Sequence, residues 1–304
     1  MTRRAFPDLD ARGIIHPHDA KAQKTLQALP GFKALGRWAS DRSPEAQVRA
    51  QVQSRSITGD DYDRLEALYR EAVRILDVQQ VPDLFYVNHP SVNAAAVGWQ
   101  NPFIVVTTGT AELPDEALMM ILGHELTHII CDHMRFKFTA IHLRTVGWAA
   151  FLASPLVGGL SVAGLSAGLA MWDRRSELTA DRGGLLTAQS FAAPRTLFER
   201  LERQMPSTDE LPPGLSQLVQ VMNTHPDLPD RMKALDEWVG SGIYERMVSG
   251  DYPRRSLEGR SADDAEYGAH LDALAEIALL EREVDRGPSA AELEAIAMKE
   301  LEDF

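Results

Sequence analysis

The chain reads His124-Glu125-Leu126-Thr127-His128 near its middle, and this stretch determines how the rest of the sequence is interpreted. In a helix, residues four apart lie on one face, so the two imidazoles can reach one ion. Glu125 points slightly further round the helix, where it can accept a proton from a water molecule rather than bind the metal. The pattern predicts a catalytic zinc site, one ion per chain, with Glu125 as general base.

A catalytic zinc needs a third protein ligand and one open position. The metzincin extension of the motif would need glycine at position 131 and histidine at 134, but this chain has Cys131 and Met134 there. The gluzincin pattern instead needs a glutamate on a second helix, followed four residues later by an acid. Glu177 and Asp181 meet that requirement. We predict that Glu177 is the third ligand and that Asp181 accepts the spare N–H of a ligand histidine, most simply that of His124.

One more histidine follows the motif closely. His133 lies five residues beyond His128, and in a continuous helix over residues 115–138 that spacing places it off the metal-facing stripe. We therefore expect a surface or helix-end histidine at this position. On the second helix, three small residues should let the two helices approach closely: Ala180, Gly183 and Gly184.

Hydropathy periodicity predicts an α+β fold that is predominantly helical, with a small β-sheet and helical extensions at both ends. The zinc motif adds the expectation that the core is zincin-like. Strands are expected at residues 84–87, 94–99 and 103–107. Helices are expected at about 20–29, 46–53, 60–76, 115–138, 177–204, 214–222, 229–238, 265–284 and 288–302. The predicted domains are an N-terminal arm with short helices (1–56), the catalytic core (57–240) and a C-terminal extension packed on the core (241–304).

Composition excludes some classes of partner and leaves others open. The 304 residues are 44% apolar, which supports a real core, and the net charge of -13 argues against nucleic acid as a partner. The single cysteine, Cys131, gives no sign of an oxidising compartment, and no secretory signal follows Met1. We expect a cytoplasmic protein. The sequence does not indicate its oligomeric state.

Residues 145–172 carry no charge, and a stretch of that length could cross a bilayer once. A single crossing would separate Glu177 from the histidine helix by a membrane, and a hairpin of two crossings needs roughly 40 residues. Membrane spanning is therefore not expected. A packed helical pair within the fold is the favoured interpretation, and peripheral or re-entrant membrane contact is the alternative.

In their order along residues 26–235, the motifs of this chain resemble those of the M48 family of metallopeptidases, the Ste24- and HtpX-like proteases. The similar segments are a strand with an Asn-Ala-x-Ala stretch (82–98), the strand, loop and helix that deliver the zinc motif (103–128), a Glu-x-x-Ala-Asp helix (175–184) and a His-Pro-x-x-x-x-Arg motif (224–231). The resemblance is greatest to the soluble bacterial members. It implies zinc-dependent endopeptidase activity on proteins or peptides.

Further roles are expected around the zinc. His225, at a turn before a proline, is a candidate donor to the oxyanion; alternatively it could fill the fourth zinc position or simply bond the backbone. Arg231 could anchor that loop by pairing with an acid of the core. The edge strand that begins with Asn93, Ala94, Ala95 and Ala96 would bind substrate by strand addition, although plain packing would also explain the alanines.

Regulation and alternative functions are less constrained. His16 and His18 in the N-terminal arm could cover the cleft, but mobile surface histidines are the more ordinary interpretation. Two other functions compete with the peptidase: a catalytically silent, zinc-containing binding or chaperone-like protein, and a quality-control protease attached peripherally to a membrane. An intact Glu125 weighs against the silent protein.

Overall fold

The computed structural model describes residues 3–28, 45–137, 162–203 and 228–257, and all structural statements below concern these residues. His225, residues 145–161 of the uncharged stretch, the helix expected at 214–222 and the helices expected after residue 258 lie outside them.

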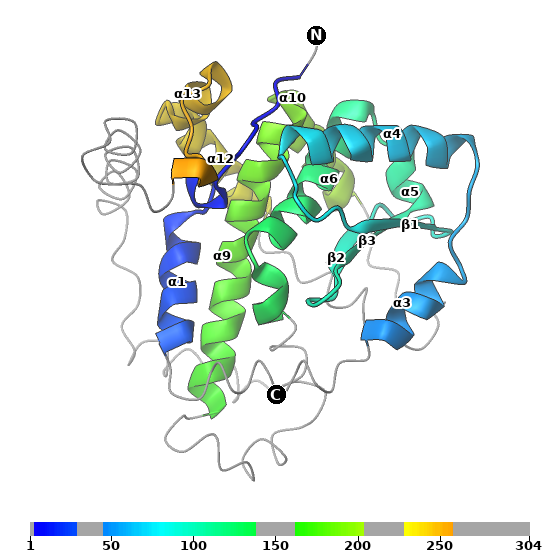
Figure 1. Ribbon diagram of the computed structural model, residues 1–304, viewed down its shortest axis with the longest axis horizontal. Coiled ribbons are helices and arrows are strands. Elements are labelled where there is room, and N and C mark those ends of the chain that lie inside the picture. Colours follow the sequence, from blue (N-terminus) through cyan, green and yellow to red (C-terminus); the bar gives the residue numbers. More distant parts are fainter. Residues whose placement is uncertain (1–2, 29–44, 138–161, 204–227, 258–304) are drawn as a thin grey trace.

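The structure confirms the α+β prediction with a mainly helical chain and one small sheet (Figure 1). The helices are α1 (Pro17–Ala28), α3 (Glu45–Gln53), α4 (Asp60–Ile75), α5 (Thr108–Ala111), α6 (Asp115–Ile130), α9 (Val162–Ala188), α10 (Ala192–Glu202), α12 (Leu228–Gly240) and α13 (Ile243–Ser249), with 3-10 turns η1 (Ala11–Gly13) and η3 (Arg255–Leu257). The strands are β1 (Asp83–Val87), β2 (Ala94–Val97) and β3 (Phe103–Thr107).

The sheet has the order β1-β3-β2, with β3 parallel to β1 and antiparallel to β2. Side chains alternate between its faces. Ile104 and Val106 of β3 join the main hydrophobic core, whereas Phe103 and Val105 pack in a smaller cluster with Val52 of α3. Strand β2 therefore forms one edge of the sheet, beside α6.

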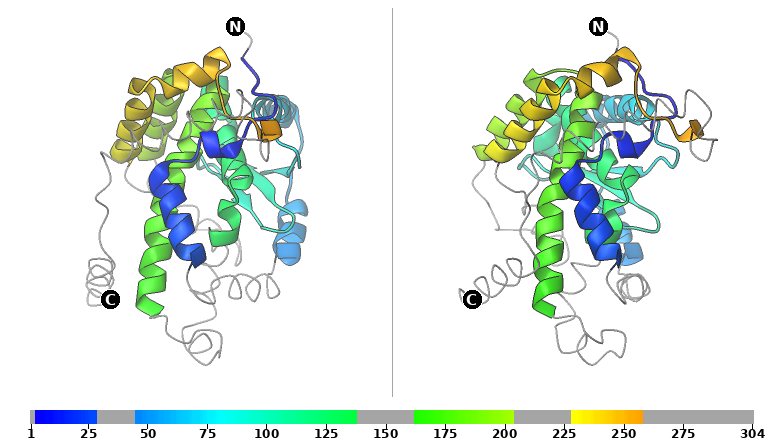
Figure 2. Two further views of the ribbon diagram at one scale, coloured as in Figure 1. Left: turned by 60° about the vertical axis from the view of Figure 1, so that its left-hand side comes forward. Right: turned by 90° about the vertical axis from the view of Figure 1, so that its left-hand side faces the viewer.

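Helix α6 is the central element of the fold (Figures 1 and 2). It contacts α4 and β2 on one side and α9 on the other. Every residue from Ala117 to His128 is buried, because a helix that is apolar on nearly all sides must be covered on nearly all sides. The metal-binding motif thus begins inside the core.

Helices α6 and α9 pack closely because glycines lie where they meet. A Cβ atom on Gly183 would lie 1.7 Å from Thr127 Oγ1, and one on Gly123 would lie 2.2 Å from Thr187 Oγ1. A Cβ on Gly184 would lie 2.7 Å from the Met120 carbonyl oxygen. Gly183 and Gly184, two of the three small residues expected to permit this approach, therefore do so.

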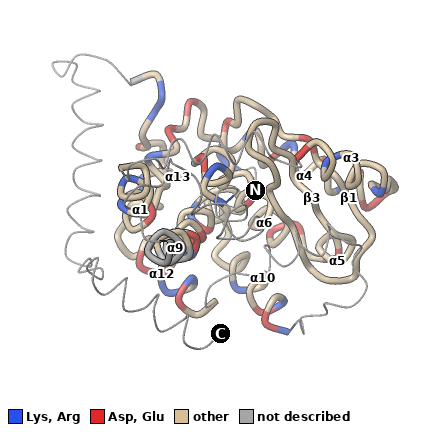
Figure 3. The backbone as a smooth tube through the Cα atoms, turned by 90° about the horizontal axis from the view of Figure 1, so that it is seen from below, with Lys and Arg blue, Asp and Glu red and all other residues tan. Residues whose placement is uncertain are grey.

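Part of the uncharged stretch belongs to α9. Val162–Trp172 forms the first turns of the helix that later carries Glu177, and the Trp172 side chain is fully buried. None of the described helices combines the length and the apolar character needed to cross a bilayer. Acidic and basic residues are interspersed along the described backbone (Figure 3).

The described N-terminal and C-terminal segments pack together. Phe6, Leu9 and Ile14 belong to the same core cluster as Tyr252, whose ring meets that of Phe6 edge-on at 5.4 Å. The domain boundaries at residues 56 and 240 stay predictions, but both outer segments contribute to the core of the catalytic segment.

Replacing Gly183 by alanine should destabilise the protein by about 2–3 kcal/mol. Better helix propensity would contribute about 1 kcal/mol in the opposite direction, but overpacking at a rigid helix contact outweighs it. Gly240→Ala is the matched control, because a Cβ there meets nothing within 4 Å. Urea denaturation measures both variants. Equal midpoints for them would show that the close helix contact is not required.

Candidate metal centre

Helix α6 presents His124, Glu125 and His128 in the interior, each at most 5% exposed. The Nε2 atoms of the two histidines lie 3.2 Å apart, so both rings point to one place. This convergence follows from the four-residue spacing on one helical face.

Glu177 of α9 completes the cluster. Its Oε2 lies 3.3 Å from His124 Nε2, and its Oε1 lies 3.2 Å from His128 Nε2. Donors about 2.1 Å from a tetrahedral metal are separated from one another by about 3.4 Å, which is close to these spacings. Two imidazoles and one carboxylate also form a common donor set for a catalytic metal, one that leaves a fourth position open. The three residues therefore fit a metal ion, as the ligand atoms of all three lie within 4.8 Å of one another.

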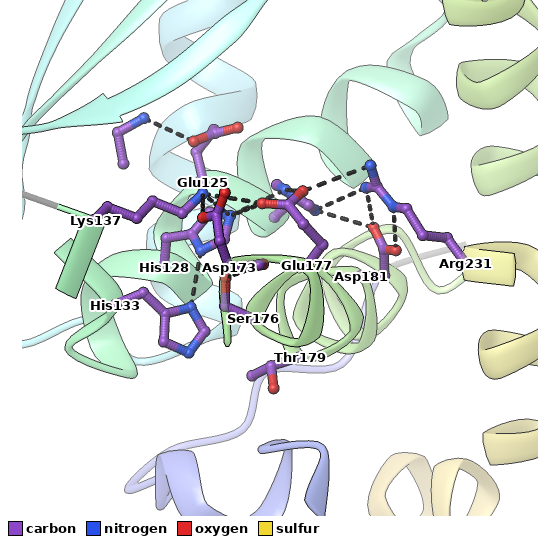
Figure 4. Close-up of polar contacts among 12 residues, drawn as sticks. Glu125, His128, His133, Lys137, Asp173, Ser176, Glu177, Thr179, Asp181 and Arg231 are labelled. Carbon is purple, nitrogen blue, oxygen red and sulfur yellow. Dashed lines mark hydrogen bonds and ion pairs between the residues drawn. The ribbon is translucent and has the colours of Figure 1, made fainter. Parts of the chain in front are cut away.

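Asp181, one turn beyond Glu177, lies beside Arg231 (Figure 4) and next to His124. Its Oδ1 is 3.0 Å from His124 Nδ1, and Arg231 donates to both of its oxygens, from Nε at 2.7 Å and from Nη2 at 2.6 Å. Burial opposes ionisation of Asp181, but the Arg231 guanidinium outweighs it and holds the pKa of Asp181 below its usual value. Arg231 also approaches Glu177 Oε2 at 3.5 Å.

The pKa values of His124 and His128 are shifted in opposite directions. Burial acts to lower the pKa of His124, but hydrogen bonds to Asp181 and Glu177 outweigh it and raise that pKa to about 9. For His128, burial and the nearby Lys137 hold the pKa well below its usual value. Without a metal ion, His124 rather than His128 is therefore the protonated histidine near neutral pH.

The Glu125 carboxylate faces the sheet. The backbone N–H of Ala96 in β2 donates to Glu125 Oε2 at 2.7 Å, which fixes the carboxylate between the ligand cluster and the edge strand. Burial raises the pKa of Glu125 above its usual value, and the positive charges of His124 and Lys137 offset only part of that rise.

The N–H of Ala96 points away from β3, and in an antiparallel pair such residues alternate with those that bond their neighbour. Ala94 and Ala96 therefore direct their backbone groups away from β3, and Ala95 bonds β3; Ala94 is itself buried. Asn93 is buried, and its backbone carbonyl accepts from Thr107 N–H. Substrate binding by these four residues stays a prediction.

The prediction for His133 was wrong. His133 is fully buried, and its Nδ1 lies 2.8 Å from His128 Nδ1. Helix α6 ends at Ile130, and Asp132 adopts a left-handed conformation with φ of 56°. This turn redirects the chain, so the helical arithmetic that placed His133 on the surface does not apply beyond Ile130.

The N-terminal histidines are also less exposed than expected. His16 and His18 are half-buried, and the backbone N–H of His16 donates to Thr179 Oγ1 of α9 at 2.9 Å. Both residues contact the second helix of the site, through Thr179 and Arg175, and are not fully exposed.

Lys137 was missed by the sequence reasoning, because only the turn at Asp132 brings it to the site. Its ammonium donates to Glu177 Oε1 at 2.9 Å, lies 3.3 Å from His128 Nε2 and is 3.8 Å from Asp173 Oδ1 (Figure 4). It therefore competes with a metal ion for the same ligand atoms. Burial acts to lower the pKa of Lys137, but Glu177 and Asp173 outweigh it and raise that pKa.

Comparisons with known proteins agree with this geometry. The model of a family described as Peptidase family M48 matches residues 61–239. The chain is similar to "Plastoglobule-localized metallopeptidase 48, chloroplastic" of Arabidopsis thaliana, with 34% identity over 60% of this chain and 54% of that protein. It is also similar to a "Protease HtpX homolog" of Bacillus licheniformis, with 23% identity over 72% of this chain and 85% of that protein. The chain thus spans about half the length of the plant relative. No solved structure gives a significant match.

Metal binding should release about one proton near pH 7, because the ion displaces the proton that His124 carries below a pKa of about 9. The sign follows directly: lower pH favours the proton, so affinity should fall about tenfold per unit below pH 9. Calorimetric titration in buffers of different ionisation enthalpy measures the proton count. No release and a flat pH profile would contradict the assignment.

Lys137→Met should bind a divalent metal about tenfold more tightly. A unit charge about 4 Å from a partly buried divalent ion is worth up to about 8 kcal/mol, and most of this repulsion is avoided by movement of the ammonium toward Asp173. Competition with a chelating dye measures the affinity. Lys233→Met, at an exposed ion pair on α12, is the matched control. Weaker binding by Lys137→Met would mean that the ammonium supports the metal rather than competing with it.

Proposed function

Because this chain belongs to peptidase family M48, we propose that it is a zinc-dependent endopeptidase. His124, His128 and Glu177 would hold the zinc, and Glu125 would serve as general base. The observation that carries the proposal is the position of the Glu125 carboxylate, beside three converging ligand atoms and bonded to the edge strand of the sheet.

The donor set supports zinc as the metal. Two nitrogens and one oxygen at near-tetrahedral spacing suit an ion without a strong geometric preference of its own. When bound, zinc would polarise the substrate carbonyl and make a water molecule more acidic. Asp181 and Arg231 would hold His124 in the orientation that this requires.

Glu125 would take the proton of the attacking water and pass it to the leaving amine. Its raised pKa brings it closer to neutral pH, where a base accepts and returns a proton most effectively. The bond from Ala96 N–H restrains the carboxylate, so it would be in place before substrate arrives. His225 remains a candidate donor to the oxyanion.

Substrate would bind as an extended strand beside β2, using the backbone groups of Ala94 and the carbonyl of Ala96, whose N–H already donates to Glu125. A peptide there would lie along the sheet edge with its scissile bond next to Glu125, a geometry suited to cleavage within a chain. Membership of a peptidase family implies protein or peptide substrates. Cytoplasmic location and peripheral membrane contact through residues 145–172 stay predictions.

Glu125→Gln should retain one zinc per chain but lower peptide hydrolysis by about 10²–10⁴-fold, because an amide cannot accept the proton. The amide oxygen can still accept from Ala96 N–H, so the fold should be kept. Zinc analysis and digestion of a quenched casein substrate measure the two properties. Glu116→Gln, on the first turn of the same helix, is the matched control.

Each other outcome excludes a specific part of the proposal. Hydrolysis by Glu125→Gln at the wild-type rate would exclude Glu125 as the base. Zinc binding by a wild-type protein that cleaves nothing would favour the silent binding or chaperone-like function. Absence of zinc from the wild-type protein would exclude the metal site.

A further inference from the structure

A buried chain of hydrogen bonds joins His128 to the N-terminal helix. His128 Nδ1 lies 2.8 Å from His133 Nδ1, and His133 Nε2 lies 2.9 Å from Asp19 Oδ2 of α1. His133 and Asp19 are both fully buried. Asp19 is 109 positions before His128 in sequence (128 − 19) and precedes the region that matches the family.

Asp19 can only be the final acceptor in this series of hydrogen bonds. Its Oδ1 accepts from Trp172 Nε1 and Gln23 Nε2, each at 3.0 Å, and its Oδ2 accepts from Thr179 Oγ1 at 2.6 Å. An indole N–H only donates, and Thr179 already accepts from a backbone N–H, so these groups present hydrogens to the carboxylate. A carboxylate so surrounded has no proton to give to His133.

Because Asp19 only accepts, the direction of the other hydrogen bonds in this series is fixed as well. His133 must donate from Nε2 to Asp19, and its other ring nitrogen, Nδ1, can then accept from His128. His128 must then donate from Nδ1, and its Nε2 carries the lone pair. Lys137, at the other end of this series of hydrogen bonds, leads to the same tautomer of His128. Its ammonium can only donate and lies 3.3 Å from His128 Nε2, so that nitrogen must carry the lone pair.

We propose that Asp19 and His133 are positioning residues of the metal centre, which hold His128 in the tautomer and orientation whose Nε2 atom binds the metal. The inference rests on the proposed role of His128 as a ligand. It makes helix α1 part of the metal site, although α1 contributes no ligand. Outer partners of ligand histidines typically contribute about 10- to 100-fold in metal affinity.

Asp19→Asn should weaken zinc binding by about 10- to 100-fold. The amide oxygen must face Trp172, because the opposite orientation sets an NH2 group against the indole N–H. The NH2 group then faces His133, and the direction of each hydrogen bond in the series is reversed. His133 accepts at Nε2 and donates from Nδ1. The hydrogen of His128 therefore moves to Nε2, the atom that would bind the metal. The same logic makes a wrong histidine tautomer damaging in serine proteases.

Two substitutions of His133 test the proposal a second way, in case Asp19→Asn folds poorly. A glutamine side chain at this position could donate to Asp19 and accept from His128, so His133→Gln should keep zinc affinity within about threefold. His133→Leu has similar bulk but offers His128 no acceptor, and it should lose about as much affinity as Asp19→Asn. A purely structural role predicts no such difference.

Thr179→Val is the packing control, since it removes one hydrogen bond to Asp19 without altering the direction of the chain. It should lower thermal stability but leave zinc affinity within about threefold. Zinc transfer to a chelating dye measures affinity in all four variants. Histidine ring 15N spectra of the metal-free protein report the tautomer directly, and should show the hydrogen of His128 on Nδ1.

The inference is overturned if Asp19→Asn and His133→Leu both bind zinc like the wild type, if Thr179→Val weakens binding as much as they do, or if the ring spectra place the hydrogen of His128 on Nε2. A wild-type protein that binds no zinc would instead refute the proposed function. The two failures are therefore distinguishable.

Discussion

The site depends on one close contact between two helices. Three donor atoms separated by little more than 3 Å can come from α6 and α9 only if the backbones nearly touch beside them. Gly123 on α6 and Gly183 on α9 lie within one or two turns of the ligands, at points where a Cβ would collide with a threonine of the facing helix. Those threonines, Thr127 and Thr187, bond back to carbonyls of their own helices and leave no polar atom unpaired at the contact.

The same close packing concentrates charge in a dry interior. Several carboxylates lie within the site or directly behind it with at most 5% exposure: Asp19, Glu125, Glu177 and Asp181. Buried charges are tolerated only where they are paired. Arg231 pairs Asp181 on both oxygens, Lys137 lies against Glu177, and His124 carries a proton, but these three positive charges do not balance the four acids. A divalent cation among the ligand atoms would reduce this excess of negative charge, so metal binding and stability are coupled here.

Local patterns could be predicted, and contacts between distant residues could not. The helix expected at 60–76 is Asp60–Ile75, and the strand expected at 103–107 is Phe103–Thr107, because each follows from a short-range period in hydropathy. The convergence of His124, His128 and Glu177 was predicted from the four-residue spacing and the acidic pair on a second helix. His133 was assigned wrongly because one left-handed residue, Asp132, ends the period on which its assignment relied. Aspartate tolerates that conformation better than most residues, but nothing in the sequence requires it there.

His124 and His128 are supported in different ways, and the difference bears on where the unit that could hold a metal begins. The Nδ1 of His124 meets the carboxylate of Asp181 directly, from the same helix that supplies Glu177. The Nδ1 of His128 reaches a carboxylate only through His133, and that carboxylate belongs to α1. A unit starting at residue 57 would keep all three ligands and Asp181, yet it would leave His133 Nε2 without its acceptor in the interior. An unpaired buried donor costs about 1–3 kcal/mol. His133 can avoid this cost by changing its tautomer or rotating its ring, and either change alters its hydrogen bond with His128. Asp19 of α1 is therefore part of the hydrogen-bonded surroundings of the metal centre, although it precedes the residues that match the family.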